Sequence, residues 1–115
     1  MGAMARTTTG RRDLDLAEVL RALGDPTRLE IVCLLSDRVS RTTSEVAETI
    51  GLPASTCSYH LKQLRSAGVT ACHIDGKNRY PILRIDELDV AFPGLVGLLV
   101  AEDRKPASDG EPAPA

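Results

Sequence analysis

Apolar residues recur at helical spacing through the first part of the chain. The first predicted helix has four of them on one face: Leu16, Val19, Leu20 and Leu23. Asp13 is a suitable N-cap for this helix, and Gly24 ends it. A second helix begins at once, with Asp25 as its N-cap and Pro26 in its first turn, where the missing N–H costs nothing. Its buried positions are expected to be Leu29, Ile31, Val32, Leu34 and Leu35.

A helix-turn-helix pattern follows these two helices. Thr42–Glu45 has the spacing of a capping box and starts a short helix that Gly51 ends. After the turn at 51–53, a longer helix over Ser55–Arg65 has an inward apolar stripe and closes at Gly68. The stripe consists of Cys57, Leu61 and Leu64. Because Ser and Thr are good N-caps, we expect one of the early hydroxyl residues to cap this helix.

The outer side of this helix is polar and is predicted to read DNA. The major groove admits one helix and presents hydrogen-bond donors and acceptors on the base edges. The candidate DNA-binding residues of the helix are Ser55, Thr56, Ser58, Tyr59, Lys62, Gln63 and Arg65.

Two segments rich in β-branched residues come next, at 69–74 and 80–85. The residues between them form a turn, so a hairpin, or wing, is predicted. Pro81 cannot donate to a β-ladder, and the second strand should therefore be an edge strand or bulged. The candidate DNA contacts of the wing are Lys77, Asn78 and Arg79. The alternative is that these residues belong to a solvent-exposed turn that does not contact DNA.

The last apolar segment predicts a symmetric partner. A turn runs from Asp86 through Leu88 and Phe92, and Pro93 starts a terminal helix. That helix is apolar on nearly all sides, which is more surface than a chain of 115 residues can cover by itself. A homodimer interface is expected at Leu16, Leu20, Leu95, Leu98 and Leu99.

These elements define the expected fold class and domains. The fold is mainly α with a β-hairpin wing (α+β), a winged helix-turn-helix in the order ααααββα. The folded domain spans residues 13–101. Residues 1–12 and the acidic, Pro- and Ala-rich residues 102–115 lack apolar periodicity and are predicted to be disordered.

Composition agrees with a binder of double-stranded DNA. Aromatic residues are only 3% of the chain, so stacking on single-stranded bases is disfavoured. The net charge is −2, but the segment 54–85 has an excess of Lys and Arg over its one acid, Asp75. No apolar run is long enough for a membrane span or typical of a signal peptide, so a cytoplasmic protein without membrane association is expected.

Other kinds of chemistry have weaker support. The chain has no Gly-rich phosphate loop and no nucleophile elbow, which disfavours an enzyme, and no cofactor is expected. The chain has three cysteines, and their spacing matches neither a disulfide framework nor a zinc site. Cys57 lies on the inward stripe and is read as a core residue. His60 is expected to hydrogen-bond to backbone, and Cys72 and His73 to point to opposite faces of a strand.

Two alternatives stay open. One is a thiol-responsive or atypical metal-responsive repressor that uses Cys33, Cys57 or Cys72. The other is a protein-interaction module built on the same fold.

Three runs of the sequence resemble one known family. They are Leu20–Leu29, Ser44–Leu52 and Ser55–Val69, and they are similar to the ArsR family of bacterial winged helix-turn-helix repressors over about 85 residues. The resemblance implies a homodimer formed by the first and last helices. Such a dimer would bind an imperfect inverted repeat in a promoter and release it when an effector binds.

The resemblance also assigns residues. By position, Ser55, Thr56, Ser58, Tyr59 and Lys62 match the DNA-facing residues of the family's recognition helix, and Lys77 to Arg79 match its wing tip. Ala54 departs from the pattern, because Gln is frequent there, and so the operator cannot be copied from relatives. Relatives often have a charged residue at the position of Cys33, and the resemblance therefore implies that Cys33 is partly exposed and oxidisable.

The metal ligands of many family members are missing from this sequence. The segment 39–45 has no Cys and the segment 86–101 has no His, so metal sensing at those two places is not expected. The effector is left unidentified.

Overall fold

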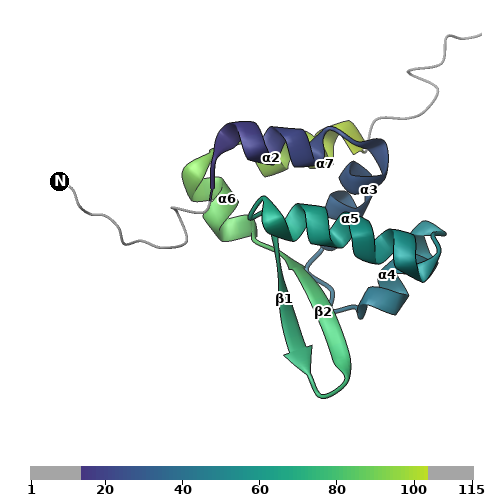
Figure 1. The fold of residues 1–115 in the computed structure, drawn as a ribbon. Coiled ribbons are helices and arrows are strands. Elements are labelled where there is room, and N and C mark those ends of the chain that lie inside the picture. The colour runs from purple at the N-terminus through teal and green to yellow at the C-terminus, as the bar shows by residue number, and fades with distance from the viewer. Residues whose placement is uncertain (1–13, 104–115) are drawn as a thin grey trace, which may run out of the picture.

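The computed structural model describes residues 14–103, which form a winged helix-turn-helix (Figure 1). In chain order its elements are α2 (Leu16–Leu23), α3 (Pro26–Leu35), α4 (Thr43–Ile50), α5 (Ala54–Ser66), β1 (Thr70–Asp75), β2 (Asn78–Leu83), α6 (Ile85–Ala91) and α7 (Leu95–Asp103). The fold class expected from the sequence is confirmed. The one added element is α6, where only a turn was expected.

Side-chain caps set the starts of the first three helices. Asp15 caps α2, because its carboxylate accepts a hydrogen bond from the Glu18 N–H at 3.2 Å. The expected cap, Asp13, lies outside the described residues. Asp25 caps α3 as expected, and the capping box of α4 is complete: the Thr42 hydroxyl accepts from the Glu45 N–H at 3.1 Å, and the Glu45 carboxylate accepts from the Thr42 N–H at 2.8 Å.

The core is almost entirely aliphatic and is built around α5. Cys57, Leu61 and Leu64 of α5 are buried, which confirms the predicted inward stripe. They pack in one cluster with residues of α2, α3 and α4: Val19, Leu23, Ile31, Val32, Leu35 and Val46. Leu29 and Leu34 of α3 are only partly buried and pack against this cluster. The inner side of α5 is therefore packed against three other helices.

The wing is a regular two-stranded antiparallel hairpin that projects away from the helices (Figure 1). Asp75 pairs with Asn78, so the turn is only Gly76-Lys77, and the strands reach closer to the tip than predicted. Gly76 has a φ of 64°, which favours glycine. Pro81 lies opposite Cys72 without a bulge, and both strands are edge strands, as Pro81 required.

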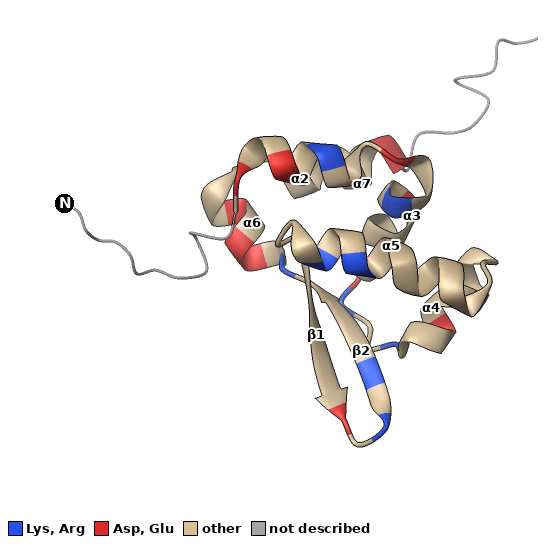
Figure 2. Cartoon of the chain, in the orientation of Figure 1, with Lys and Arg blue, Asp and Glu red and all other residues tan. Residues whose placement is uncertain are grey.

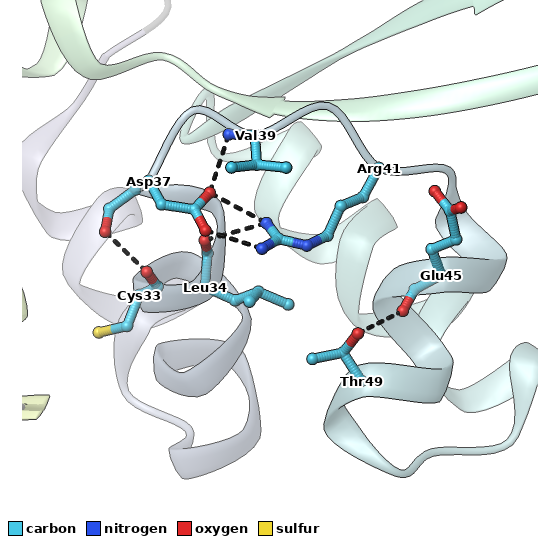
Figure 3. A network of polar contacts seen from close by, with 8 residues as sticks. Cys33, Leu34, Asp37, Val39, Arg41, Glu45 and Thr49 are labelled. Carbon is cyan, nitrogen blue, oxygen red and sulfur yellow. Dashed lines mark hydrogen bonds and ion pairs between the residues drawn. The ribbon is translucent and has the colours of Figure 1, made fainter.

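A polar network fixes the loop between α3 and α4 (Figure 3). Arg41 donates two hydrogen bonds to the Asp37 carboxylate, at 3.0 and 2.7 Å, and one to the Leu34 carbonyl at 3.3 Å. The Arg41 hydrogen bonds, with one from the Val39 N–H, hold the pKa of Asp37 below its ordinary value. This loop leads directly into the capping box, so the network helps to place the start of α4.

The last helix differs from the prediction at both ends. α7 begins at Leu95 rather than Pro93, because Gly94 has a left-handed φ of 91° and separates it from α6. It continues to Asp103, two residues beyond the expected boundary at Ala101. Within residues 14–103, no helix is long and apolar enough to cross a membrane.

The capping box of α4 gives a prediction about stability. Thr42→Ala removes the hydroxyl that accepts from the Glu45 N–H, and we expect the free energy of unfolding to fall by about 1 kcal/mol. Thr49→Ala is the control, because the Thr49 hydroxyl only donates to the Glu45 carbonyl inside the helix and Ala is a better helix former. Urea denaturation of both variants makes the comparison. Equal losses would show that the box contributes nothing specific.

Candidate nucleic-acid interface

A basic groove of about 660 Å³ runs between the start of α4, the outer side of α5 and the wing. Lys62 and Arg65 line it from α5, and Lys77 and Arg79 line it from the wing. No Asp or Glu is among the residues described in its lining. Figure 2 shows the contrast: the charged residues of α5 are all Lys or Arg, whereas those of α6 are all Asp or Glu. The groove therefore offers cations to an anionic ligand despite the negative net charge.

Most of the predicted DNA-binding residues meet in this groove. Its lining includes Ser58, Lys62, Arg65, Lys77, Asn78 and Arg79. Ser55 and Tyr59 lie on the exposed surface of α5 beside it, with 55% of Tyr59 exposed. Thr56 and Gln63 are half-buried and do not line the groove. The outer surface of α5 is thus polar where the sequence predicted it, with these two residues turned partly away.

The predicted cap of α5 is wrong. Pro53 is the N-cap, and the helix has no side-chain cap, so Ser55, Thr56 and Ser58 all lie inside the helix. Proline takes this place because its φ of −61° and ψ of 148° suit an N-cap and it follows the turn directly. The hydroxyls of Ser55 and Ser58 are therefore on the exposed surface and do not satisfy the helix end. The positive end of α5 lies at the groove, since Ala54 lines it.

Sequence reasoning missed one wall of the groove. Thr42, Thr43 and Ser44, at the start of α4, also line it. The Thr43 hydroxyl donates to the Arg79 carbonyl at 3.4 Å, which joins α4 to the wing. No local pattern relates two residues that are 36 apart in the sequence, so only the folded structure reveals this contact. Arg84, another cation of the basic segment, donates to the Gly68 carbonyl at 3.0 Å and helps to hold the base of the wing.

His60 has a different partner from the one expected. Its Nδ1 lies 3.1 Å from a guanidinium nitrogen of Arg28, a side chain of α3, and not against a backbone group. Its ring also packs edge-on against Tyr59, with ring centroids 5.3 Å apart. A long-range side-chain contact of this kind has no signature in the local sequence.

The cysteines are free thiols in differing surroundings. Cys57 has no exposed surface, and burial raises its pKa. Cys33 is partly exposed, as expected, and its Sγ donates to the Leu99 carbonyl at 3.5 Å. Burial, followed by the negative charges of Asp103 and Glu30, raises the pKa of Cys33. A raised pKa lowers the fraction of reactive thiolate at neutral pH.

Cys33 also lines a second, more apolar groove of about 630 Å³ between α3 and α7. Leu29, Leu98 and Leu99 form part of its wall, and Glu30, Glu102 and Asp103 give it an acidic rim. In the described part of the chain, no three His, Cys, Asp or Glu residues are grouped so that they could hold a metal ion.

Comparison with known proteins gives the family. Residues 23–73 match the model of a helix-turn-helix domain. The HTH-type transcriptional regulator YceK of Bacillus subtilis is 36% identical over 72% of this chain and 84% of its own length. An ArsR-like transcriptional regulator from Rhodococcus sp. RHA1 is 26% identical with a TM-score of 0.61, over 82% of this chain and 88% of its own.

A third relative shares the fold. The homodimeric winged helix-turn-helix domain of Mb0332 from Mycobacterium bovis is 24% identical, with a TM-score of 0.64 over 91% of this chain and 94% of its own. The chain belongs to the ArsR family of helix-turn-helix transcriptional regulators. It is a DNA-binding regulator and not an enzyme.

The surroundings of Cys33 predict a slow thiol. We expect iodoacetamide to alkylate Cys33 more slowly in the native protein at pH 7 than in the unfolded protein. The rate should rise only when the pH exceeds the ordinary pKa of a cysteine thiol. Asp103→Asn should speed the reaction because it removes a negative charge. Asp89→Asn, on α6, is the control and should not change the rate. Mass spectrometry of the labelled peptides follows each cysteine, and an Asp103→Asn rate equal to wild type would contradict the electrostatic explanation.

Proposed function

We propose that this protein is a dimeric repressor that binds an inverted repeat in a promoter and leaves it when an effector binds. The observation that carries the proposal is the basic groove, where cations from two separate elements, α5 and the wing, face the same space. A B-DNA major groove is about 12 Å wide and admits one helix, with its phosphates within reach on either side. The groove between α5 and the wing suits this arrangement of one helix and one flanking strand of phosphates.

The residues divide into two roles. Lys62, Arg65, Lys77 and Arg79, with Asn78 beside them, would contact phosphates and supply most of the affinity. The exposed polar side chains of α5 would contact base edges and supply the sequence preference. These are Ser55, Thr56, Ser58, Tyr59 and Gln63, with Thr56 and Gln63 the least accessible of them.

Exposed leucines support the dimer. Leu16 and Leu20 of α2 are 47% and 50% exposed, and Leu98 of α7 is 57% exposed. Leu95 and Leu99 of α7 are half-buried against the core. In Figure 1, α2 and α7 lie at the end of the molecule away from the wing. A second copy packed on this end would cover the leucines and leave both recognition helices free for successive major grooves. The related domain of Mb0332 is a homodimer.

On this proposal the effector would not bind at the family's two familiar metal sites, because the segment 39–45 has no Cys and the segment 86–101 has no His. A thiol switch at Cys33 or Cys57 has less support, because the pKa of each is raised. A protein-interaction module would not need the cations that line the groove. Since the proposed target is promoter DNA, the protein would act in the cytoplasm.

Titration onto the DNA upstream of its own gene tests the proposal. We expect a specific complex that weakens steeply as salt rises, because bound cations release counterions from the phosphates. Lys62→Gln and Arg79→Gln should weaken binding to every sequence, and each should lower the slope of log K against log salt by about 1. Arg21→Gln is the control, because Arg21 lies on α2 and pairs with Glu18 at 2.9 Å. No complex even at low salt would overturn the proposal.

The dimer can be tested separately. Leu20→Glu places a charge on the exposed apolar end of the molecule, and we expect a monomer by sedimentation equilibrium, with affinity for the inverted repeat lowered at least tenfold. Val39→Glu is the matched control, because Val39 is 54% exposed on the loop before α4. It should leave the dimer intact. A dimeric Leu20→Glu protein would remove α2 from the interface.

A further inference from the structure

Arg28 ties three parts of the molecule together. Its Nε donates a hydrogen bond to the Ala22 carbonyl at 2.7 Å, near the C-terminal end of α2. One of its terminal nitrogens lies 3.1 Å from Nδ1 of His60 on α5. Its own backbone N–H donates to the Asp25 cap of α3 at 3.0 Å. A single side chain therefore connects α2, whose exposed leucines suggest the dimer interface, to the recognition helix.

The chemistry of this contact determines which ring nitrogen of His60 is protonated. A guanidinium has only donors and stays charged in proteins, so it cannot accept a hydrogen bond. Nδ1 of His60 must therefore be the acceptor, which places the ring proton on Nε2. A second proton, on Nδ1, would remove the acceptor and set two cations 3.1 Å apart. The contact exists only while His60 is neutral.

The position of His60 on α5 relates its contact with Arg28 to DNA binding. His60 is half-buried at the edge of the inward stripe of α5, while Tyr59 beside it is exposed on the outer surface. The two rings pack edge to face, at an interplanar angle of 66°. The groups that face His60 are the Arg28 guanidinium and the Asp25 carboxylate from α3 and Tyr59 from its own helix. Loss of the Arg28 contact would release the His60 ring, against which Tyr59 rests.

We propose that Arg28 and His60 are positioning residues that hold the Tyr59 side chain on the DNA-reading surface of α5, and that protonation of His60 breaks this contact and releases Tyr59. This inference rests on the proposed function, because its readout is DNA affinity. The inference predicts that DNA affinity changes with pH in the direction opposite to the usual one. Added positive charge at low pH ordinarily tightens binding to DNA. Here affinity should fall as the pH drops and Nδ1 of His60 gains a proton.

The two histidines of the chain provide a matched pair of variants. In His60→Gln the amide oxygen can still accept from Arg28 and cannot titrate. We expect wild-type affinity for the upstream DNA to fall roughly tenfold between pH 7.5 and 5.5, which is the loss of about one charge-assisted hydrogen bond. His60→Gln should bind like wild type at pH 7.5 and stay level. His73→Gln, on the exposed wing, should retain the fall.

A second variant and a spectroscopic measurement complete the test. Arg28→Gln should weaken binding at pH 7.5, while Arg21→Gln should not. In the ¹⁵N spectrum of wild type at pH 7.5, Nδ1 of His60 should have the chemical shift of an unprotonated acceptor nitrogen. This measurement uses only the wild-type protein, so it does not depend on whether a variant folds. A wild-type affinity that is level or rises at low pH, a fall that persists in His60→Gln, or a protonated Nδ1 would each overturn the inference.

The outcomes also separate the two proposals. Wild-type protein that does not bind DNA at any pH contradicts the proposed function. Salt-dependent binding that does not weaken at low pH leaves the proposed function intact and overturns only the role of Arg28 and His60.

Discussion

The burial of one side of α5 decides which residues of this protein can reach DNA. Cys57 and Leu64 have no exposed surface and Leu61 has 4%, so the helix cannot rotate without moving them into water. Burying one leucine side chain contributes roughly 1.5–3 kcal/mol, and these residues pack against three other helices. Rotation by one residue, about 100°, would remove most of that energy. The direction of Ser58, Lys62 and Arg65 is thus set by the residues on the opposite side of the helix.

The division of charge depends on the same arrangement. With the inner side of α5 buried, its cations Lys62 and Arg65 line the groove, and the wing brings Lys77 and Arg79 to the same groove. The contact from Thr43 to the Arg79 carbonyl and that from Arg84 to the Gly68 carbonyl hold the wing at both of its ends. Acidic residues lie on α6 and at the end of α7, and those on α4 and the wing are not among the residues that line the groove (Figure 2). A net charge of −2 is for this reason a poor guide to what the protein binds.

The features predicted from the sequence were those with a local physical cause. The Asp25 cap, the Thr42–Glu45 box and the stripe of α5 each depend on residues within one or two turns, and all three are confirmed. Errors arose where two local signals competed. Pro53 took the N-cap that the hydroxyls of α5 also suit, and Gly94 displaced the start of the last helix from Pro93.

The wing and the segment after it were misjudged for a related reason. Branched residues indicate strands but do not fix a register, so the turn came out shorter than predicted. Contacts that join distant segments had no local signal at all. Arg28 and His60 are 32 residues apart, and Thr43 and Arg79 are 36 apart. Part of the groove lining and the whole of the link to α2 were therefore visible only in the folded structure.

The same packing that fixes α5 also restricts how an effector could release it. The core beneath α5 is aliphatic and close-packed, so a signal cannot act there without a large loss of stability. Polar contacts lie at the edge of this core instead, among them the contact of Arg28 with His60 and the joint between α4 and the wing. Of these, only Arg28 also reaches α2, through the Ala22 carbonyl. If two copies pack on α2 as proposed, a change in that packing would reach α5 through the contact of Arg28 with His60, while the buried stripe stays intact.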